Sequence, residues 1–200
     1  MFAVEDNGFV GPWFANQGMQ QYLTPREDNR LIAYEARTGK LAWMKGGPRG
    51  DATEEFAGTF FPGAPLILEN RAYCLTEAGS EIRLQVLEPR TGKLEWSQLL
   101  MTAENPVLYE YNRRMLGLTP SYSDGILICP TEAGAVIAVD MLSRSLLWCY
   151  RYPVPSTDNA RIPRMWAMQQ RFQRQNGGRG LAGNDTERWQ DSTPIIADGH

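Results

Sequence analysis

Few side chains in this sequence have the type and spacing that catalysis or metal binding requires. The 200 residues include three cysteines, Cys74, Cys129 and Cys149, and a single histidine, His200. Cys149 has no partner at metal-ligand spacing. Without an internal histidine, the Ser-His-Asp and Cys-His arrangements have no general base. We therefore predict no catalytic, cofactor-binding or metal-binding residue in this chain.

Two further motifs look chemical but have simpler explanations. The glycine-rich stretch at 177–180 lacks the lysine and the strand-to-helix context of a phosphate-binding loop. Thr-Glu-Ala-Gly occurs at 76–79 and again at 131–134. A catalytic residue is not expected in every repeat, so we predict that Glu77 and Glu132 flank turns rather than act as a carboxylate pair. No acidic cluster has the spacing of a calcium loop.

The elements that must position these residues repeat along the chain. Thr-Gly-Lys-Leu-Ala-Trp at 38–43 returns at 91–96 and, more loosely, at 143–148, with tryptophans 53 and then 52 residues apart. A period of this size with short β-type runs is typical of a propeller or a solenoid. Cys74 and Cys129 fall at equivalent repeat positions, so we predict that both are small buried apolar side chains.

Each repeat unit predicts four antiparallel strands. In the middle copy they cover 66–68, 72–75, 82–87 and 93–100. Short pairs such as Glu69-Asn70 predict tight turns with positive φ. The connection before the fourth strand predicts a type I turn ending in a left-handed glycine. Arg144 replaces that glycine in the third copy, where positive φ would cost about 1 kcal/mol, so we expect a slightly different turn there.

Four strands per unit without an amphipathic helix predict an all-β fold, a partial β-propeller of four-stranded antiparallel blades. About two blades are complete and two are partial, too few to close a ring, so we expect the remainder of the propeller in a longer chain. Self-association that supplies the missing blades is the alternative. We assign all of 1–200 to one propeller domain, comprising partial blade one (1–47), blade two (63–100), blade three (119–150), an arginine-rich insertion (151–191) and the start of blade four (192–200).

Three insertions interrupt the repeat, at 9–29, 101–118 and 151–191. The second is compatible with a short helix. The third contains seven arginines and four acidic residues. This insertion either binds an acidic partner or forms a solvated surface helix with a mobile tail. Aromatic residues in the connections either form an apolar binding surface or pack down and tether the loops. These aromatic residues are Trp13, Phe14, Phe60, Phe61, Trp166 and Trp189.

The overall composition excludes some classes of partner. A hydrophobic content of 42% is globular, and a net charge of −3 gives no general attraction to nucleic acid or to anionic membranes. No apolar run approaches the 18 residues of a membrane span. We therefore expect neither a nucleic-acid partner nor a membrane span in this chain.

The repeat resembles that of the pyrroloquinoline quinone (PQQ)-like propellers, the quinoprotein alcohol dehydrogenase-like family. Their pattern is Ala, any residue, Asp, two residues, Thr-Gly, three residues and Trp. Residues 33–43, 86–96 and 138–148 are similar, with acidic residues at the third position and tryptophans at the last. The resemblance implies that each tryptophan docks between neighbouring blades, with the acidic residue near the following turn. The six residues are Glu35, Glu88, Asp140, Trp43, Trp96 and Trp148.

The family contains quinoprotein dehydrogenases and cofactor-free scaffolds, among them the outer-membrane assembly lipoprotein. The dehydrogenases carry an adjacent Cys-Cys pair, which this chain lacks, together with calcium ligands and an axial Asp. The resemblance therefore implies a non-catalytic scaffold of the bacterial cell envelope, without cofactor, in the periplasm or envelope. A protein or polymer partner would bind through loops 9–29 and 151–191. The alternative is a fragment of a PQQ-dependent dehydrogenase whose active-site residues lie outside this chain.

Overall fold

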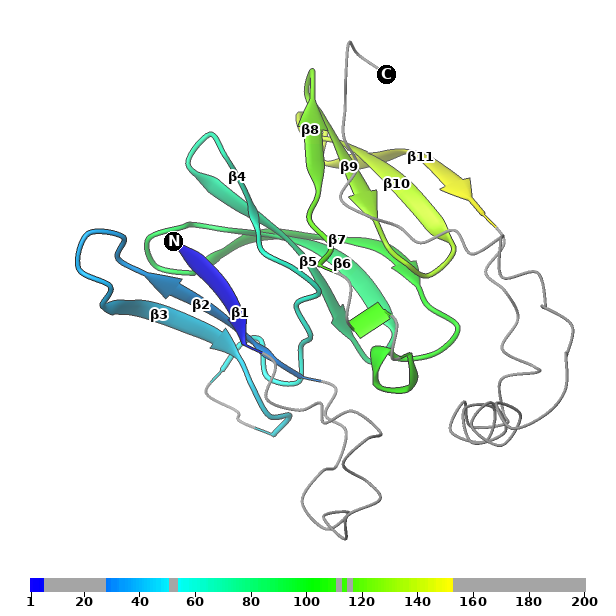
Figure 1. Ribbon diagram of the computed structural model, residues 1–200. Helices are drawn as coiled ribbons and strands as arrows, with labels where there is room; N and C mark the ends of the chain where they lie inside the picture. The colour runs from blue at the N-terminus through cyan, green and yellow to red at the C-terminus, as the bar shows by residue number, and fades with distance from the viewer. Residues whose placement is uncertain (6–27, 51–53, 111–112, 115–116, 153–200) are drawn as a thin grey trace, which may run out of the picture.

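The computed structural model describes residues 1–5, 28–50, 54–110, 113–114 and 117–152. This part of the chain forms three antiparallel sheets, which we call blades one, two and three (Figure 1). Blade one contains β1 (Phe2–Glu5), β2 (Arg30–Tyr34) and β3 (Leu41–Gly46). Blade two contains β4 (Leu66–Leu68), β5 (Arg71–Ala78), β6 (Glu81–Leu87) and β7 (Leu94–Thr102). Blade three contains β8 (Ser121–Ser123), β9 (Ile126–Pro130), β10 (Ala135–Asp140) and β11 (Ser145–Arg151).

The sheets confirm the all-β architecture of four-stranded blades. In each sheet the strands follow the order of the sequence, so every neighbour is an antiparallel hairpin partner. The four strands expected in the middle copy are present, and β5 and β7 extend beyond their predicted ends. In blade one, Val4 pairs with Leu31 just as Leu75 pairs with Leu84 in blade two. β1 is therefore the counterpart of β5. The predicted start of blade four lies outside the described residues.

Turn chemistry explains the short hairpins between the first two strands of blades two and three. Glu69 and Asn70 have φ values of 47° and 58°, and Asp124 and Gly125 have values of 49° and 82°. Left-handed pairs of this kind match the natural twist of two-residue hairpins. The positive φ values expected from the sequence are confirmed.

The expectation of a different turn at Arg144 is wrong. Arg144 has a φ of 56°, in the same left-handed region as Gly39 at 70° and Gly92 at 71°. The turn is held by the Ser143 N–H, which donates to Asp140 Oδ1 at 2.7 Å. The Arg144 guanidinium also lies 5.5 Å from the centre of the Trp96 ring. A cation–π contact of this type offsets the cost of the left-handed backbone.

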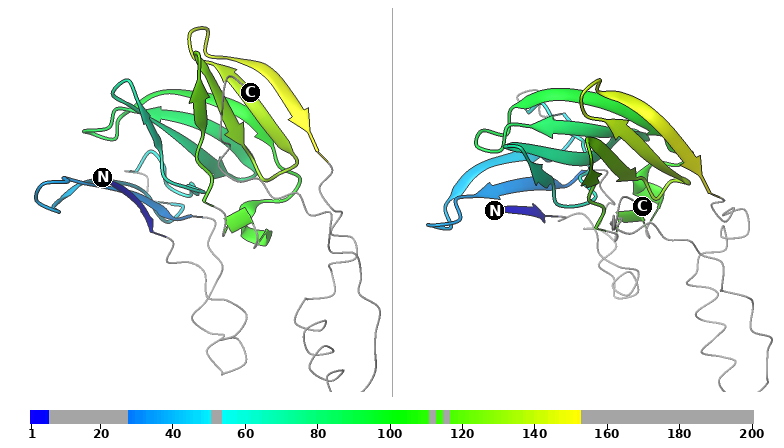
Figure 2. Two further views of the ribbon diagram at one scale, coloured as in Figure 1. Left: turned by 45° about the horizontal axis from the view of Figure 1, so that its top comes forward. Right: turned by 90° about the horizontal axis from the view of Figure 1, so that it is seen from above.

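Blade two lies between the other two blades and packs on both (Figures 1 and 2). Because side chains alternate across a strand, Ala72 and Cys74 on β5 join an apolar cluster shared with blade one. Tyr73 and Leu75 on the opposite face join a second cluster shared with blade three. β5 is therefore buried on both faces, which explains its nearly unbroken apolar sequence.

The repeated tryptophan docks onto the turn of the next blade. Trp43 Nε1 in blade one donates to the Pro89 carbonyl in blade two at 2.9 Å. The ring lies so close to Gly92 that a Cβ there would stand 2.8 Å from Trp43 Cδ2. Trp96 meets the equivalent turn of blade three through Arg144. Trp148 in blade three is 47% exposed in the described structure.

Replacing Gly92 with alanine tests this docking, with Gly39→Ala as the matched control. Both glycines are left-handed, so each substitution costs about 1 kcal/mol of backbone strain. A Cβ at Gly39 meets nothing within 4 Å, whereas one at Gly92 meets the Trp43 ring. We expect Gly92→Ala to lower the free energy of unfolding by about 1–3 kcal/mol more than the control, measured by urea denaturation. Equal losses would show that the indole does not press on this turn.

Candidate functional site

The two ends of the blades differ in what they carry. At one end, the strand pairs are joined by tight turns such as 88–93 and 141–144. At the other end lie the turn between β5 and β6 and the exits of β3, β7 and β11. We call the second the connection end. β1 ends there at Glu5 and β2 begins there at Arg30, because these two residues pair. The Tyr152 N–H, just after β11, donates to the Gly134 carbonyl at the same end.

Buried polar contacts hold the segment 54–62, which links β3 of blade one to β4 of blade two. We call this segment the first connection. The Asn29 side chain donates to the Phe61 carbonyl at 2.8 Å and accepts from the Phe61 N–H at 2.7 Å. One residue earlier, Phe60 exchanges two backbone hydrogen bonds with Glu77 on β5. The connection thus makes an isolated β-bridge to blade two and is held beside blade one by the Asn29 side chain. Both groups of Asn29 are used, which explains why an amide is buried here.

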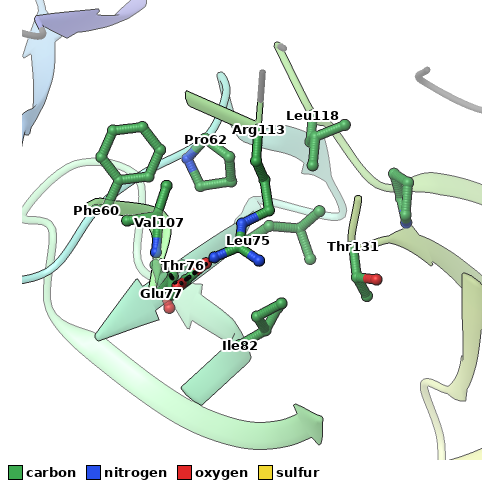
Figure 3. A pocket seen from close by; sticks show the side chains of 11 residues that line it. Phe60, Pro62, Leu75, Thr76, Glu77, Ile82, Val107, Arg113, Leu118 and Thr131 are labelled. Carbon is green, nitrogen blue, oxygen red and sulfur yellow. Dashed lines mark hydrogen bonds and ion pairs between the residues drawn. The ribbon is translucent and has the colours of Figure 1, made fainter. Parts of the chain in front are cut away.

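Glu77 also contacts the segment 103–118, which links blade two to blade three and which we call the second connection. Its Oε1 accepts from the Val107 N–H at 2.7 Å and from Arg113 Nη2 at 2.8 Å (Figure 3). The same Nη2 donates to the Asn105 carbonyl at 2.7 Å. Glu77 and Arg113 are 5% and 6% exposed, so this is a buried ion pair. It ties the connection, which includes a 3-10 helix over Val107–Tyr109, onto the end of β5.

This arrangement is suited to holding a loop rather than to reacting. The buried carboxylate accepts its hydrogen bonds from an amide and a guanidinium, and Arg114 next to the pair lies 4.9 Å from the centre of the Phe60 ring. The sequence predicts that Glu77 flanks a turn, but it does not predict the ion pair with Arg113. The signal that was available is an acidic residue inside an otherwise apolar strand, which must be paired when it is buried.

The acidic residues of the repeat lie at the opposite end and stabilise turns. Glu35 Oε2 accepts from the Thr38 hydroxyl and Glu88 Oε2 from the Thr91 hydroxyl, each at 2.6 Å. The Thr91 hydroxyl is the main cause of a lowered pKa at Glu88, and the Ser143 N–H is the main cause at Asp140. These contacts explain why an acidic residue precedes Thr-Gly by three positions.

The cysteines separate into two buried thiols and one exposed thiol. Cys74 and Cys129 are buried in the two inter-blade clusters, and Cys149 is exposed on β11. Burial raises the pKa of Cys74 and of Cys129 to about 12. In the part of the chain that the structure describes, no three His, Cys, Asp or Glu side chains are grouped as metal ligands.

The aromatic residues of the connections pack inward where they are described. Phe60 and Phe61 are both buried, and Phe61 lies 5.9 Å from Phe56, centre to centre. Phe60 and Phe61 therefore tether the loop, as in the second of the two interpretations of the sequence. The other four aromatic residues, and nearly all of the insertions at 9–29 and 151–191, lie outside the described residues. Among described helices, none is long and apolar enough to cross a membrane.

Removing Glu77 tests whether the ion pair anchors the connection. Glu77→Ala leaves the buried charge of Arg113 uncompensated and should lower the free energy of unfolding by about 3–5 kcal/mol. Adding Arg113→Met should recover part of this loss, because the buried charge is then removed. The exposed pair of Arg71 and Glu95, 2.7 Å apart, supplies the control, and Glu95→Ala should change stability little. Strictly additive effects of the two buried substitutions in urea denaturation would contradict the anchor.

The raised thiol pKa values predict selective labelling. At pH 8 in the folded protein, only Cys149 should react with a disulfide reagent, because Cys74 and Cys129 are buried and neutral. All three should react after unfolding. Both buried thiols ionise at lower pH in the unfolded chain, so stability should fall as the pH rises above about 9 towards 12. Rapid labelling of the folded Cys149→Ser variant would contradict this assignment.

A family model described as outer membrane protein assembly factor BamB matches residues 11–184. No curated protein sequence matches the chain. Among solved structures, 63 chains match.

One is a quinohemoprotein alcohol dehydrogenase, ADHIIG from Pseudomonas putida HK5, with 16% identity over 61% of this chain and 24% of that one and a TM-score of 0.40. A europium-containing methanol dehydrogenase has 15% identity over 64% and 31% of the two chains and a TM-score of 0.38. BamB from Moraxella catarrhalis has 16% identity over 61% and 46% and a TM-score of 0.29.

The chain thus spans less than half the length of each of these proteins. The family model, by contrast, covers most of the sequence and includes all three copies of the tryptophan repeat. The chain therefore belongs to the family of the outer membrane protein assembly factor BamB, among the PQQ-like propellers.

Proposed function

We propose that this chain is part of a non-catalytic propeller scaffold that holds a protein or polymer partner at its connection end. The observation that carries the proposal is that the described strands lead into three long segments at that end. The segment between Glu5 and Arg30, the connection 103–118 and the chain beyond Tyr152 all attach there. Loops on a rigid scaffold are where binding is commonly found.

The connection end is rigid enough to present such loops. Asn29, which immediately precedes β2, and Glu77 on β5 hold the two connections through buried hydrogen bonds. A loop that is already ordered loses less conformational entropy when a partner binds. The turns that the structure describes at the opposite end are short, and Glu35, Glu88 and Asp140 each accept a hydrogen bond within their own turn.

The family supplies the cellular setting of the proposal. The family model is described as an outer membrane protein assembly factor. We place this chain accordingly in the bacterial cell envelope, with loops 9–29 and 151–191 contributing to the partner surface. We also propose that 192–200 begins a fourth blade, which would cover the Trp148 face as blades two and three cover Trp43 and Trp96.

Site-specific photo-crosslinking of the whole protein in cells tests the location of the partner surface. A photoreactive residue at Glu104, exposed in the second connection, should crosslink to an envelope protein or polymer. The matched control is Arg90, exposed in a turn at the opposite end, which should give none. Crosslinks from position 90 alone, or from neither position, would refute the proposal.

Reconstitution separates the scaffold from the dehydrogenase alternative. The whole protein, incubated with PQQ and calcium and then desalted, should retain no quinone absorbance and oxidise no alcohol in a dye-linked assay. Retained quinone together with alcohol oxidation would instead assign the protein to the dehydrogenases of its fold.

A further inference from the structure

A small cavity lies beside the buried ion pair, at the junction of blades two and three. The volume open to the centre of a water molecule is about 10 Å³. Leu75, Ile82 and Leu118 form much of its wall, and the Arg113 guanidinium borders it (Figure 3). Thr76, Glu77 and Thr131 add polar groups to the lining. A space of this size holds one water molecule.

Arg113 presents a buried donor that the described residues do not satisfy. Its Nη2 is used twice, for Glu77 Oε1 and for the Asn105 carbonyl. Its Nε is buried and has no acceptor among the described residues. A buried N–H without a partner costs about 1–3 kcal/mol, more when the group is charged. Native proteins meet this cost with an ordered water where space allows.

The competing possibility is a dry cavity, because apolar cavities remain empty of water. Here the aliphatic wall favours a dry state, whereas the charged guanidinium favours a hydrated one. Desolvating an unpaired donor of a cation is the larger of the two effects. We infer that this cavity is a binding site for a single structural water that accepts a hydrogen bond from Arg113 Nε.

This water completes the anchor of the second connection. With it, the guanidinium is hydrogen-bonded on its Nε edge as well as at Nη2. A fully satisfied buried network fixes a geometry more firmly than a partly satisfied one. The water site therefore belongs to the same unit as Glu77, and it is independent of which partner the scaffold binds.

A crystal structure of the whole protein at high resolution tests the site directly. The expected result is an ordered water within about 3.2 Å of Arg113 Nε. A cavity without density, or a protein acceptor on Nε, would overturn the inference.

A solution experiment on variants provides a second test. Val107 lines the cavity, and Val107→Ile adds one methyl group to its wall. Val139→Ile adds the same group at a buried position that does not line it. Water-oxygen magnetic relaxation dispersion should report one long-lived water fewer in Val107→Ile than in the natural protein, and an unchanged number in the control. The same number in all three proteins would overturn the inference.

Discussion

The seating of one blade's indole on the next blade's turn is the constraint on which the rest of this structure depends. Trp43 reaches across to the Pro89 carbonyl, and the turn can accept the ring only because Gly92 has no side chain. The contact sets the spacing between sheets, which in turn requires small residues such as Ala72 and Cys74 on the facing strand. The repeated Thr-Gly and Trp positions in the sequence thus reflect a single type of inter-blade interaction.

Two kinds of stabilising contact lie at opposite ends of the blades. The end opposite the connection end carries the docking contacts, and Glu35, Glu88 and Asp140 accept hydrogen bonds from threonine or serine within their own turns. The connection end carries buried polar contacts that order the loops, chiefly those of Glu77 with Arg113. In the scaffold that we propose, substitution of exposed loop residues would leave the contacts that stack the sheets undisturbed.

Sequence reasoning recovered what repeats and missed what occurs once. Strands, hairpin turns and the burial of Cys74 follow from alternation and from in-phase copies, and the structure confirms them. Arg144 was misjudged because its backbone strain is offset by a ring in another blade, a contact that local rules do not encode. The partnership of Glu77 and Arg113 joins residues 36 positions apart. Its loop has no repeated counterpart to reveal it.

Hydrogen exchange of the Trp43 indole N–H, resolved by NMR and assigned with Trp43→Phe, tests the central claim most directly. The account predicts that this proton exchanges far more slowly than that of free tryptophan, because it is held against the carbonyl of the following blade. Exchange at the rate of free tryptophan in the folded protein would contradict it, and the stacking of the blades would then need another cause.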